Sequence, residues 1–279
     1  MTSYKFSIRI VENSIFGSGG STILDIEDIK INYILGMLNS CVTNEILNIL
    51  SSTMNYEVSM IESVPILIDN DKFKIVNDKT KENISLSKLD WDSFETSWDF
   101  QKHPLLTHKG NNTSVEQAFY NWLSFVEKQF NQLKANEEEL NRIFIDIYGL
   151  QEELTPEVDD KDVTISRIYN SKEDIPENMK GNNYVLTRED VIKSFISYAV
   201  GCMFGRYSID VEGLIYAGGD FKDKWKYEDG QWKVRKIVKD EDGKVVEDTW
   251  VDATFVPDMD NVLPITDDEY FEDDIVSRF

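Results

Sequence analysis

The N-terminal part of the chain alternates between apolar and polar residues before it takes on a helical spacing. Phe6, Ile8 and Ile10 fall on one side of an extended segment, which predicts a half-buried strand over residues 5–10. Glycine-rich turns and two further short strands are expected next, around 15–16 and 22–24. From 28 to 51 the apolar residues recur at helical intervals, and Asn39-Ser40 in the middle predicts a break between two packed helices.

The residue pattern changes twice between residues 56 and 98. Residues 56–68 are typical of an extended segment, and the charged stretch 69–87 predicts an exposed hairpin or loop. Trp91, Phe94 and Trp98 then follow at intervals of three and four residues, which places their rings on one helical face.

The longest periodic segment predicts a helix over about 114–148, capped by Thr113 or Ser114. Its apolar stripe needs a partner, and the apolar stretch 191–204, with Thr187 as its cap, predicts one. The two helices are expected to pack through Trp122, Val126, Leu133 and Phe195. Further on, two Asp-Gly turns within 222–252 separate short β-like runs and predict a small β-meander.

These elements predict an α+β fold: a small N-terminal α/β module, then a mainly helical region with a small β-meander. The expected organisation is a module at 1–68, a loop or hairpin at 69–87, a helical scaffold at 88–221, the meander at 222–252 and an acidic C-terminal segment at 253–279.

Charge restricts the function classes that this chain can serve. The 29 Lys and Arg residues against 52 Asp and Glu give a net charge of −23, which repels nucleic acid and anionic lipid. The first 68 residues carry 3 basic and 7 acidic side chains, whereas the last 28 carry 1 and 9. A contact with DNA is therefore expected at the N-terminal end, where the repulsion is weakest.

No residue pattern in the chain predicts an active site. Gly17-Ser18-Gly19-Gly20 could suggest a cofactor loop, but the segment before it alternates and the one after it is β-like, which favours a turn between antiparallel strands. The two histidines lack partners at metal-ligand spacing. Cys41 and Cys202 lie in apolar runs, as expected for buried thiols in a reducing cytoplasm, and no apolar run approaches the length of a membrane span. We expect no metal and no cofactor in this chain.

Several segments have sequences that are specific enough to suggest a family. They are Leu35-Gly36-Met37-Leu38-Asn39-Ser40, Asp90-Trp91-Asp92-Ser93-Phe94 through Trp98-Asp99-Phe100 and His103-Pro104, and segments within 138–150, 196–208 and 263–276. Together they resemble PglX-type adenine-specific DNA methyltransferases of BREX phage-defence systems. The resemblance covers most of the chain, except 69–87 and 222–250.

The resemblance implies adenine methylation with S-adenosylmethionine for the full-length family. Such enzymes clamp the flipped adenine with a loop that contains two adjacent prolines, and the six prolines here include no adjacent pair. We therefore expect a target-recognition-like part over 1–68 and the helical region after it, without the catalytic part, as a fragment or truncated reading frame. Alone, the chain is expected neither to bind the cofactor nor to methylate DNA.

The expected partners are double-stranded DNA, bound weakly, the missing catalytic domain and other BREX defence proteins. Lysine and arginine suit phosphates, and asparagine can read adenine edges. Candidate DNA contacts are Lys5, Arg9, Asn13, Ser18, Asn39, Ser40, Asn55 and Tyr56. Removing everything after residue 105 is expected to strengthen DNA binding, because it deletes most of the negative charge.

Two other function classes stay open. The chain could be an acidic protein-interaction module or a decoy whose charge mimics DNA, although its acids are spread over many segments and mixed with 29 bases. It could also be a small enzyme with an unrecognised site.

Overall fold

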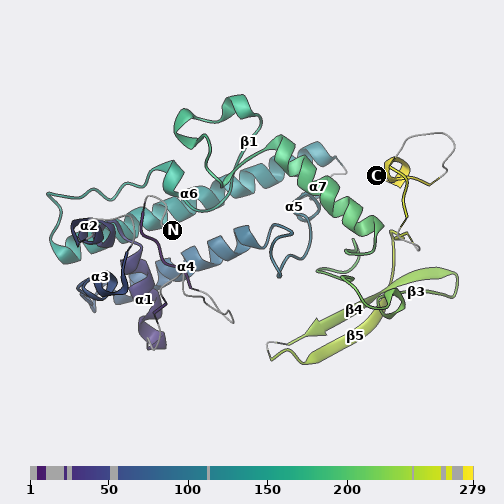
Figure 1. Cartoon of the computed structure of the whole chain (residues 1–279), viewed down its shortest axis with the longest axis horizontal. Helices are drawn as coiled ribbons and strands as arrows, with labels where there is room; N and C mark the ends of the chain where they lie inside the picture. Colours follow the sequence, from purple (N-terminus) through teal and green to yellow (C-terminus); the bar gives the residue numbers. More distant parts are fainter. Residues whose placement is uncertain are drawn as a thin grey trace. The chain divides into compact units, whose positions relative to one another are not determined.

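The computed structural model describes residues 5–10, 22–23, 27–50, 56–111, 114–240, 242–258, 262–265 and 273–278 (Figure 1). The helices are α1 (Asp28–Leu38), α2 (Cys41–Leu50), α3 (Val58–Glu62), α4 (Phe73–Trp91), α5 (Pro104–Thr107), α6 (Val115–Tyr148), α7 (Arg188–Met203) and α8 (Ile275–Arg278). Strands β1 (Arg167–Tyr169) and β2 (Val185–Thr187) form one sheet, and β3 (Trp225–Glu228), β4 (Gln231–Lys239) and β5 (Val245–Asp252) form another. The predicted α+β class is confirmed.

The chain divides into two compact units, each assembled from segments that lie far apart in the sequence. The first contains 1–88, 127–167 and 176–184, and the second contains 89–126, 168–175 and 185–279. The division passes through α6, so each half of this helix serves a different core. These two units are defined by packing, whereas the five consecutive segments were expected from composition and role. The five-segment organisation stays a prediction.

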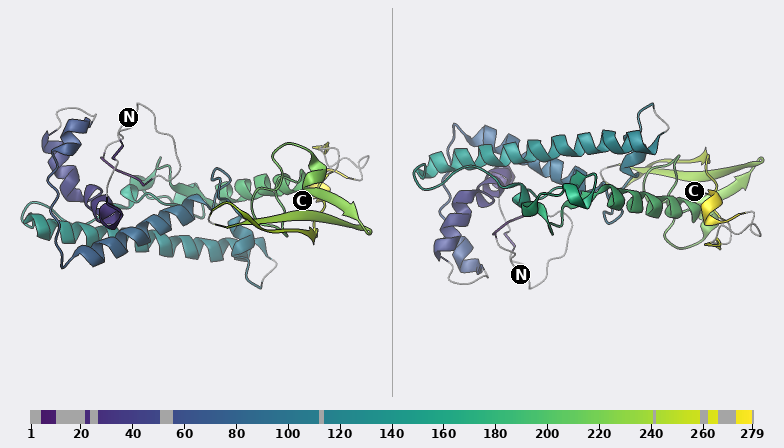
Figure 2. Two further views of the ribbon diagram at one scale, coloured as in Figure 1. Left: turned by 90° about the horizontal axis from the view of Figure 1, so that it is seen from below. Right: turned by 90° about the horizontal axis from the view of Figure 1, so that it is seen from above.

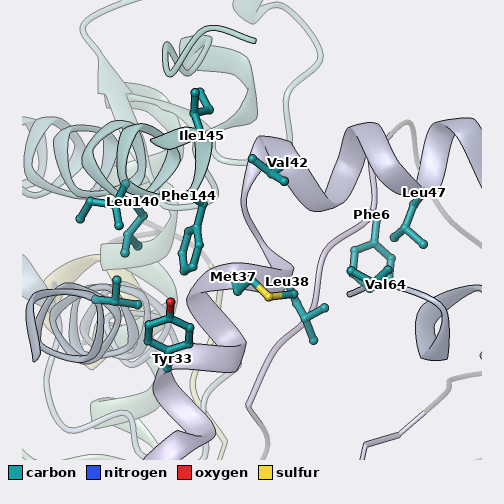
Figure 3. Close-up of a cluster of buried hydrophobic side chains, with 12 residues drawn as sticks. Phe6, Tyr33, Met37, Leu38, Val42, Leu47, Val64, Leu140, Phe144 and Ile145 are labelled. Carbon is teal, nitrogen blue, oxygen red and sulfur yellow. The ribbon is translucent and has the colours of Figure 1, made fainter. Parts of the chain in front are cut away.

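The core of the first unit is built by α1, α2 and the C-terminal half of α6 (Figure 3). Its buried side chains are Phe6, Tyr33, Met37, Leu38, Val42, Leu47, Val64, Val76, Leu140, Ile143, Phe144 and Ile145. The ring of Tyr33 stacks on Phe73 and meets Phe144 edge-on, at centroid distances of 5.3 and 5.5 Å. One continuous apolar cluster thus joins the N-terminal helices to α6.

Helix α4 runs antiparallel along the same half of α6 (Figure 2), and a buried amide sits in their seam. The Asn136 side chain donates to Glu82 and Asn83, each at 2.9 Å, and accepts from Lys79 at 2.8 Å. A buried amide with all its partners in place disfavours other registers of two helices. The seam is therefore polar at its centre and apolar at its ends.

The second unit packs α7 on the N-terminal half of α6. Trp122, Val126, Val191 and Phe195 lie in one apolar cluster, as predicted. Thr187 caps α7 in a reciprocal capping box with Asp190, which confirms the predicted helix start. A second cluster joins the three-stranded antiparallel sheet to the segment before it.

Several predicted elements are confirmed. The break at Asn39-Ser40 separates α1 from α2, α6 spans 115–148, and the three-stranded meander lies within 222–252. The turn at Asp229-Gly230 has positive φ at both residues, as a tight Asp-Gly hairpin requires. The strand expected at 15–16 lies outside the described residues.

Other predictions are wrong. Residues 5–10 pair with no strand that the structure describes: Phe6 donates its N–H to the Asn44 side chain, and the Asn39 amide accepts from the N–H and donates to the C=O of Ile8. Side-chain amides thus replace the expected ladder. Residues 56–68 contain α3 rather than a strand, and the described residues of 1–68 are helical where they are regular.

The stretch 69–87 is not a loop, because most of it lies in α4. Helix α4 ends at Trp91, and consecutive turns follow, so Trp91, Phe94 and Trp98 do not share a helical face; Trp98 is 95% exposed. Leu133 does not face α7 but packs with Phe130, Val163 and Ile165.

Candidate nucleic-acid interface

Lys5 lies among carboxylates of the first unit. Its ammonium pairs with Asp162, and 54% of its side chain remains exposed. Burial and the charge of Asp162 raise the pKa of the neighbouring Glu137 to about 7, and Lys5 partly offsets the increase. Two acidic groups therefore compete with any phosphate for this lysine.

We expect Glu137 to make the fold less stable as the pH rises. The folded chain holds this proton more tightly than an unfolded chain with the ordinary pKa of 4.5, so stability is gained as the pH falls from about 7 towards 4.5. Glu137 is half-buried, which limits the effect. Glu137→Gln should raise the free energy of unfolding by about 1–2 kcal/mol at pH 8 and change it little at pH 4.5, as measured by urea denaturation.

The control is Glu153→Gln, a change of the same type at an exposed glutamate. If Glu137→Gln changed the free energy of unfolding by the same amount at both pH values, the raised pKa of Glu137 would be contradicted.

Arg9 is exposed, and its guanidinium donates to the hydroxyl of Tyr184 at 2.9 Å. The tyrosine precedes β2, so this contact ties the N-terminal segment to a loop 175 residues away. Lys5 and Arg9 occupy alternate positions of the same extended segment, and both are exposed. They are the two sequence-predicted contacts that the structure places at the surface with cationic groups.

Asn39 and Ser40 already use their polar atoms within the fold. The Asn39 amide binds both backbone groups of Ile8 and the carbonyl of Leu35, each at 3.0 Å. Ser40 is buried, and its hydroxyl donates to the carbonyl of Met37 at 2.6 Å. These side chains hold the break between α1 and α2 and the segment that carries Lys5 and Arg9.

Tyr56 is half-buried, and its ring meets Phe6 edge-on at a centroid distance of 5.3 Å. It anchors the residue next to Lys5. Asn13, Ser18 and Asn55 lie outside the described residues, so the structure brings together five of the eight predicted contacts. Asn39 and Tyr56 contact the 5–10 segment through their side chains, and Lys5 lies in this segment beside an acid.

His103 shows why the histidines do not suggest a metal site. Its Nδ1 accepts from the backbone N–H of Leu105 at 3.2 Å and caps α5, while Nε2 lies 3.0 Å from the Ser194 hydroxyl. Burial lowers its pKa to about 4, so the ring is neutral near pH 7. Among the described residues, no group of three metal-ligating side chains comes together.

Comparison with known proteins gives two long alignments. The chain is 38% identical over 285 aligned residues to the adenine-specific methyltransferase PglX of Lacticaseibacillus casei (strain Zhang), which covers 100% of this chain. It is 32% identical over 276 residues to the adenine-specific methyltransferase BrxX of Escherichia coli O9:H4 (strain HS), covering 98%. The predicted resemblance to PglX is confirmed. The chain spans about one fifth of the length of these curated relatives, and no family model matches it.

Where the structure describes them, the PglX-like segments make packing and helix-ending contacts. In Leu35–Ser40 the glycine lets α1 approach α4, and the last two residues hold the helix break. In the PglX-like segment 196–208, Tyr198 stacks on Tyr207 at a centroid distance of 5.2 Å, and the Gly205 carbonyl accepts from the indole of Trp225 at 3.1 Å. In segment 263–276, Ile275 donates its N–H to Pro264 at 3.1 Å. These contacts give each of the three segments a role in packing or in ending a helix.

Sequence reasoning missed the densest group of basic residues. Residues 222–244 contain 8 of the 29 basic side chains, against 6 acidic ones, so this segment carries +2 in a chain of −23. Charge summed over larger segments hides this group, whereas a count over about 20 residues would have found it. No helix among the described residues is long and apolar enough to span a membrane.

Proposed function

We propose that this chain is a DNA-recognition and scaffold segment of a BREX-type adenine-specific DNA methyltransferase that acts in phage defence. The observation that carries the proposal is the similarity to PglX along the whole chain. The aligned region amounts to one fifth of that relative, so the proposed role is a part of the methyltransferase's work. Its proposed partners are double-stranded DNA, the catalytic domain of such an enzyme and other BREX proteins in the cytoplasm.

Methyl transfer itself is assigned to the other parts of the full-length family. This chain contains no adjacent prolines for an adenine clamp, and Gly17-Ser18-Gly19-Gly20 lacks the sequence context of a cofactor loop. S-adenosylmethionine would then bind elsewhere in the enzyme. This leaves contact with DNA and support of the enzyme's architecture as the work of the present chain.

Within the N-terminal part, Lys5 and Arg9 are the proposed phosphate contacts. Both lie on an exposed extended segment, and the hydrogen bonds of Asn39 fix the backbone between them. Ser40 and Tyr56 are proposed to position this segment, while Asn13, Ser18 and Asn55 stay candidates for direct contact. The acidic surroundings predict weak binding that salt readily abolishes.

We expect the full chain to bind a labelled DNA duplex weakly, with a logarithmic salt slope of roughly 1–3 in magnitude. Lys5→Gln with Arg9→Gln should reduce the affinity at low salt about tenfold, because two phosphate contacts are lost. Fluorescence anisotropy at two salt concentrations measures both quantities. Glutamine is preferred to glutamate here, because a carboxylate at position 5 would lie beside Asp162 and Glu137.

The matched control is Lys72→Gln with Lys74→Gln, which removes the same charge from exposed positions of the first unit. An equal loss in the control would show a general charge effect and contradict the proposed contacts. A DNA mimic predicts no dependence on Lys5 and Arg9. Truncation after residue 105 is unsuitable as a test, because α6 supplies Leu140, Ile143, Phe144 and Ile145 to the N-terminal core.

A further inference from the structure

An apolar run without charge lies on the surface of the first unit. Residues 63–68 contain no charged side chain, in a chain of which 29% is charged. Pro65, Ile66, Leu67 and Ile68 are all exposed, the last three by 49, 44 and 42%. A run of three or four exposed apolar residues is unfavourable in water and marks a surface that something else covers.

Two tyrosines hold the backbone of this run from one side. The Tyr148 hydroxyl donates to the carbonyl of Pro65 and accepts from the N–H of Leu67 at 3.3 Å. The Tyr33 hydroxyl donates to the carbonyl of Leu67 at 3.0 Å and accepts from the N–H of Asp69 at 3.2 Å. Burial raises the pKa of both tyrosines, so their hydroxyls keep the protons that they donate.

The bonded groups belong to alternate residues, as they do along one edge of a β-strand. In an extended chain the N–H and C=O of one residue point to one side, and those of the next residue point to the other. Pro65, Leu67 and Asp69 therefore face the tyrosines, whereas the N–H and C=O groups of Ile66 and Ile68 face away. These four groups make no hydrogen bond with any residue that the structure describes. We call them the open edge.

The run is fixed at both ends, so the open edge is in place before any partner arrives. Val64 is buried in the core of the first unit, and its N–H donates to the carbonyl of Ile61 at 3.2 Å. At the other end, the Asp69 carboxylate accepts from the N–H groups of Asp71 and Lys72, at 2.8 and 3.1 Å. A segment held in its bound form loses little conformational entropy when a partner pairs with it.

We propose that the open edge pairs with a β-strand of the methyltransferase that lies outside the region represented by this chain. The inference rests on the proposed function and names a docking surface for the rest of that enzyme. The two curated relatives are about five times as long as the aligned region, so most of such an enzyme lies outside it. Backbone pairing along an exposed edge is a common way for two folded parts to join.

Two observations favour this occupant over a second copy of the chain. By the pleat of an extended chain, Ile66 and Ile68 lie on one face and Leu67 on the other, yet all three are exposed. A continuous apolar run of this kind is typical of a strand covered on both faces, which requires a folded partner. Separate chains also need an interface of roughly 1,200 Å² or more, which one short edge does not supply. A strand of the same polypeptide is present at a high effective concentration and needs less.

Hydrogen exchange, measured residue by residue by mass spectrometry, tests the pairing without DNA. It compares this chain with the whole PglX of Lacticaseibacillus casei, a relative that aligns over the full chain. In this chain the N–H groups of Ile66 and Ile68 should exchange at nearly the unprotected rate, and those of Leu67 and Asp69 more slowly. In whole PglX the residues aligned with Ile66 and Ile68 should exchange about tenfold more slowly or less.

Tyr148→Phe tests the tyrosine side of the run in this chain. Removing the hydroxyl should speed exchange of the Leu67 N–H about two- to tenfold, as the loss of one hydrogen bond, and leave Ile66 and Ile68 unchanged. Tyr120→Phe is the matched control, the same change at an exposed tyrosine of α6, and should alter none of these rates. Equal acceleration at Leu67 and Ile66 in Tyr148→Phe would show that the run is not held along one edge and would overturn the proposal.

The remaining outcomes separate the docking surface from the proposed function. Fast exchange at the positions of whole PglX aligned with Ile66 and Ile68 overturns the pairing. Protection in this chain alone that rises with protein concentration overturns it too, because a second copy would then be the occupant. Neither result alters the DNA measurements, so the proposed function stands when the pairing fails. Slow exchange in whole PglX, with a chain that binds no duplex, supports the pairing and counts against the DNA contacts alone.

Discussion

Trp122→Ala should lower the free energy of unfolding by about 3–5 kcal/mol. The indole is 2% exposed and lies in the cluster that joins the N-terminal half of α6 to α7. It also meets the ring of His103 edge-on at a centroid distance of 6.0 Å. Removing it leaves a cavity between elements that cannot close over it without moving the buried histidine. Urea denaturation followed by circular dichroism measures the change.

The matched control for this substitution is Trp98→Ala. Trp98 is 95% exposed, so the same change of side chain there should alter stability by less than about 0.5 kcal/mol. If Trp122→Ala also changed stability by less than that, Trp122 would be exposed in solution and the packing of α6 on α7 would be wrong.

The elements that the sequence predicts well are those whose signals are local. The apolar stripe of α6 continues over many turns, the capping box of α7 lies within four residues, and the Asp-Gly turns specify the hairpins of the meander. Each signal involves neighbours in the chain, so no tertiary contact is needed to interpret it.

Helix α4 escaped prediction because its seam with α6 is polar at the centre. Phe73, Val76 and Leu86 have helical spacing, but Thr80 and Asn83 occupy the positions between them. The partner of Asn83 is Asn136, more than 50 residues away in the sequence, and Thr80 lies against Gly36 of α1. A hydrophobic pattern alone therefore suggests a loop.

The N-terminal segment shows a different limit of sequence patterns. Its alternation correctly predicts that Phe6 is buried and that Ser7 and Arg9 are exposed, but Ile10, expected on the side of Phe6, is 38% exposed. The alternation does not reveal which groups bind the backbone, and here the amides of Asn39, in the break after α1, and Asn44, in α2, do so. Two of the predicted DNA contacts, Asn39 and Tyr56, therefore hold the 5–10 segment in place through their side chains.

Gly36→Ala should be destabilising by about 2–3 kcal/mol, although alanine favours helices over glycine. A Cβ at this position of α1 would lie 2.5 Å from Thr80 Oγ1 on α4, and 3.5 and 3.7 Å from Val76 and Leu140. Because Thr80 is buried, its side chain has little room to move away. Its hydroxyl makes no hydrogen bond with any residue that the structure describes.

A double-mutant cycle isolates this contact. Thr80→Ala removes the oxygen that clashes, and the loss of a buried unpaired hydroxyl costs little. In that background Gly36→Ala should be neutral or stabilising by up to about 1 kcal/mol, since only the helix preference remains. The sign of the Gly36→Ala effect on urea unfolding thus depends on residue 80. If Gly36→Ala destabilised both backgrounds equally, the close approach of α1 to α4 at this glycine would be refuted.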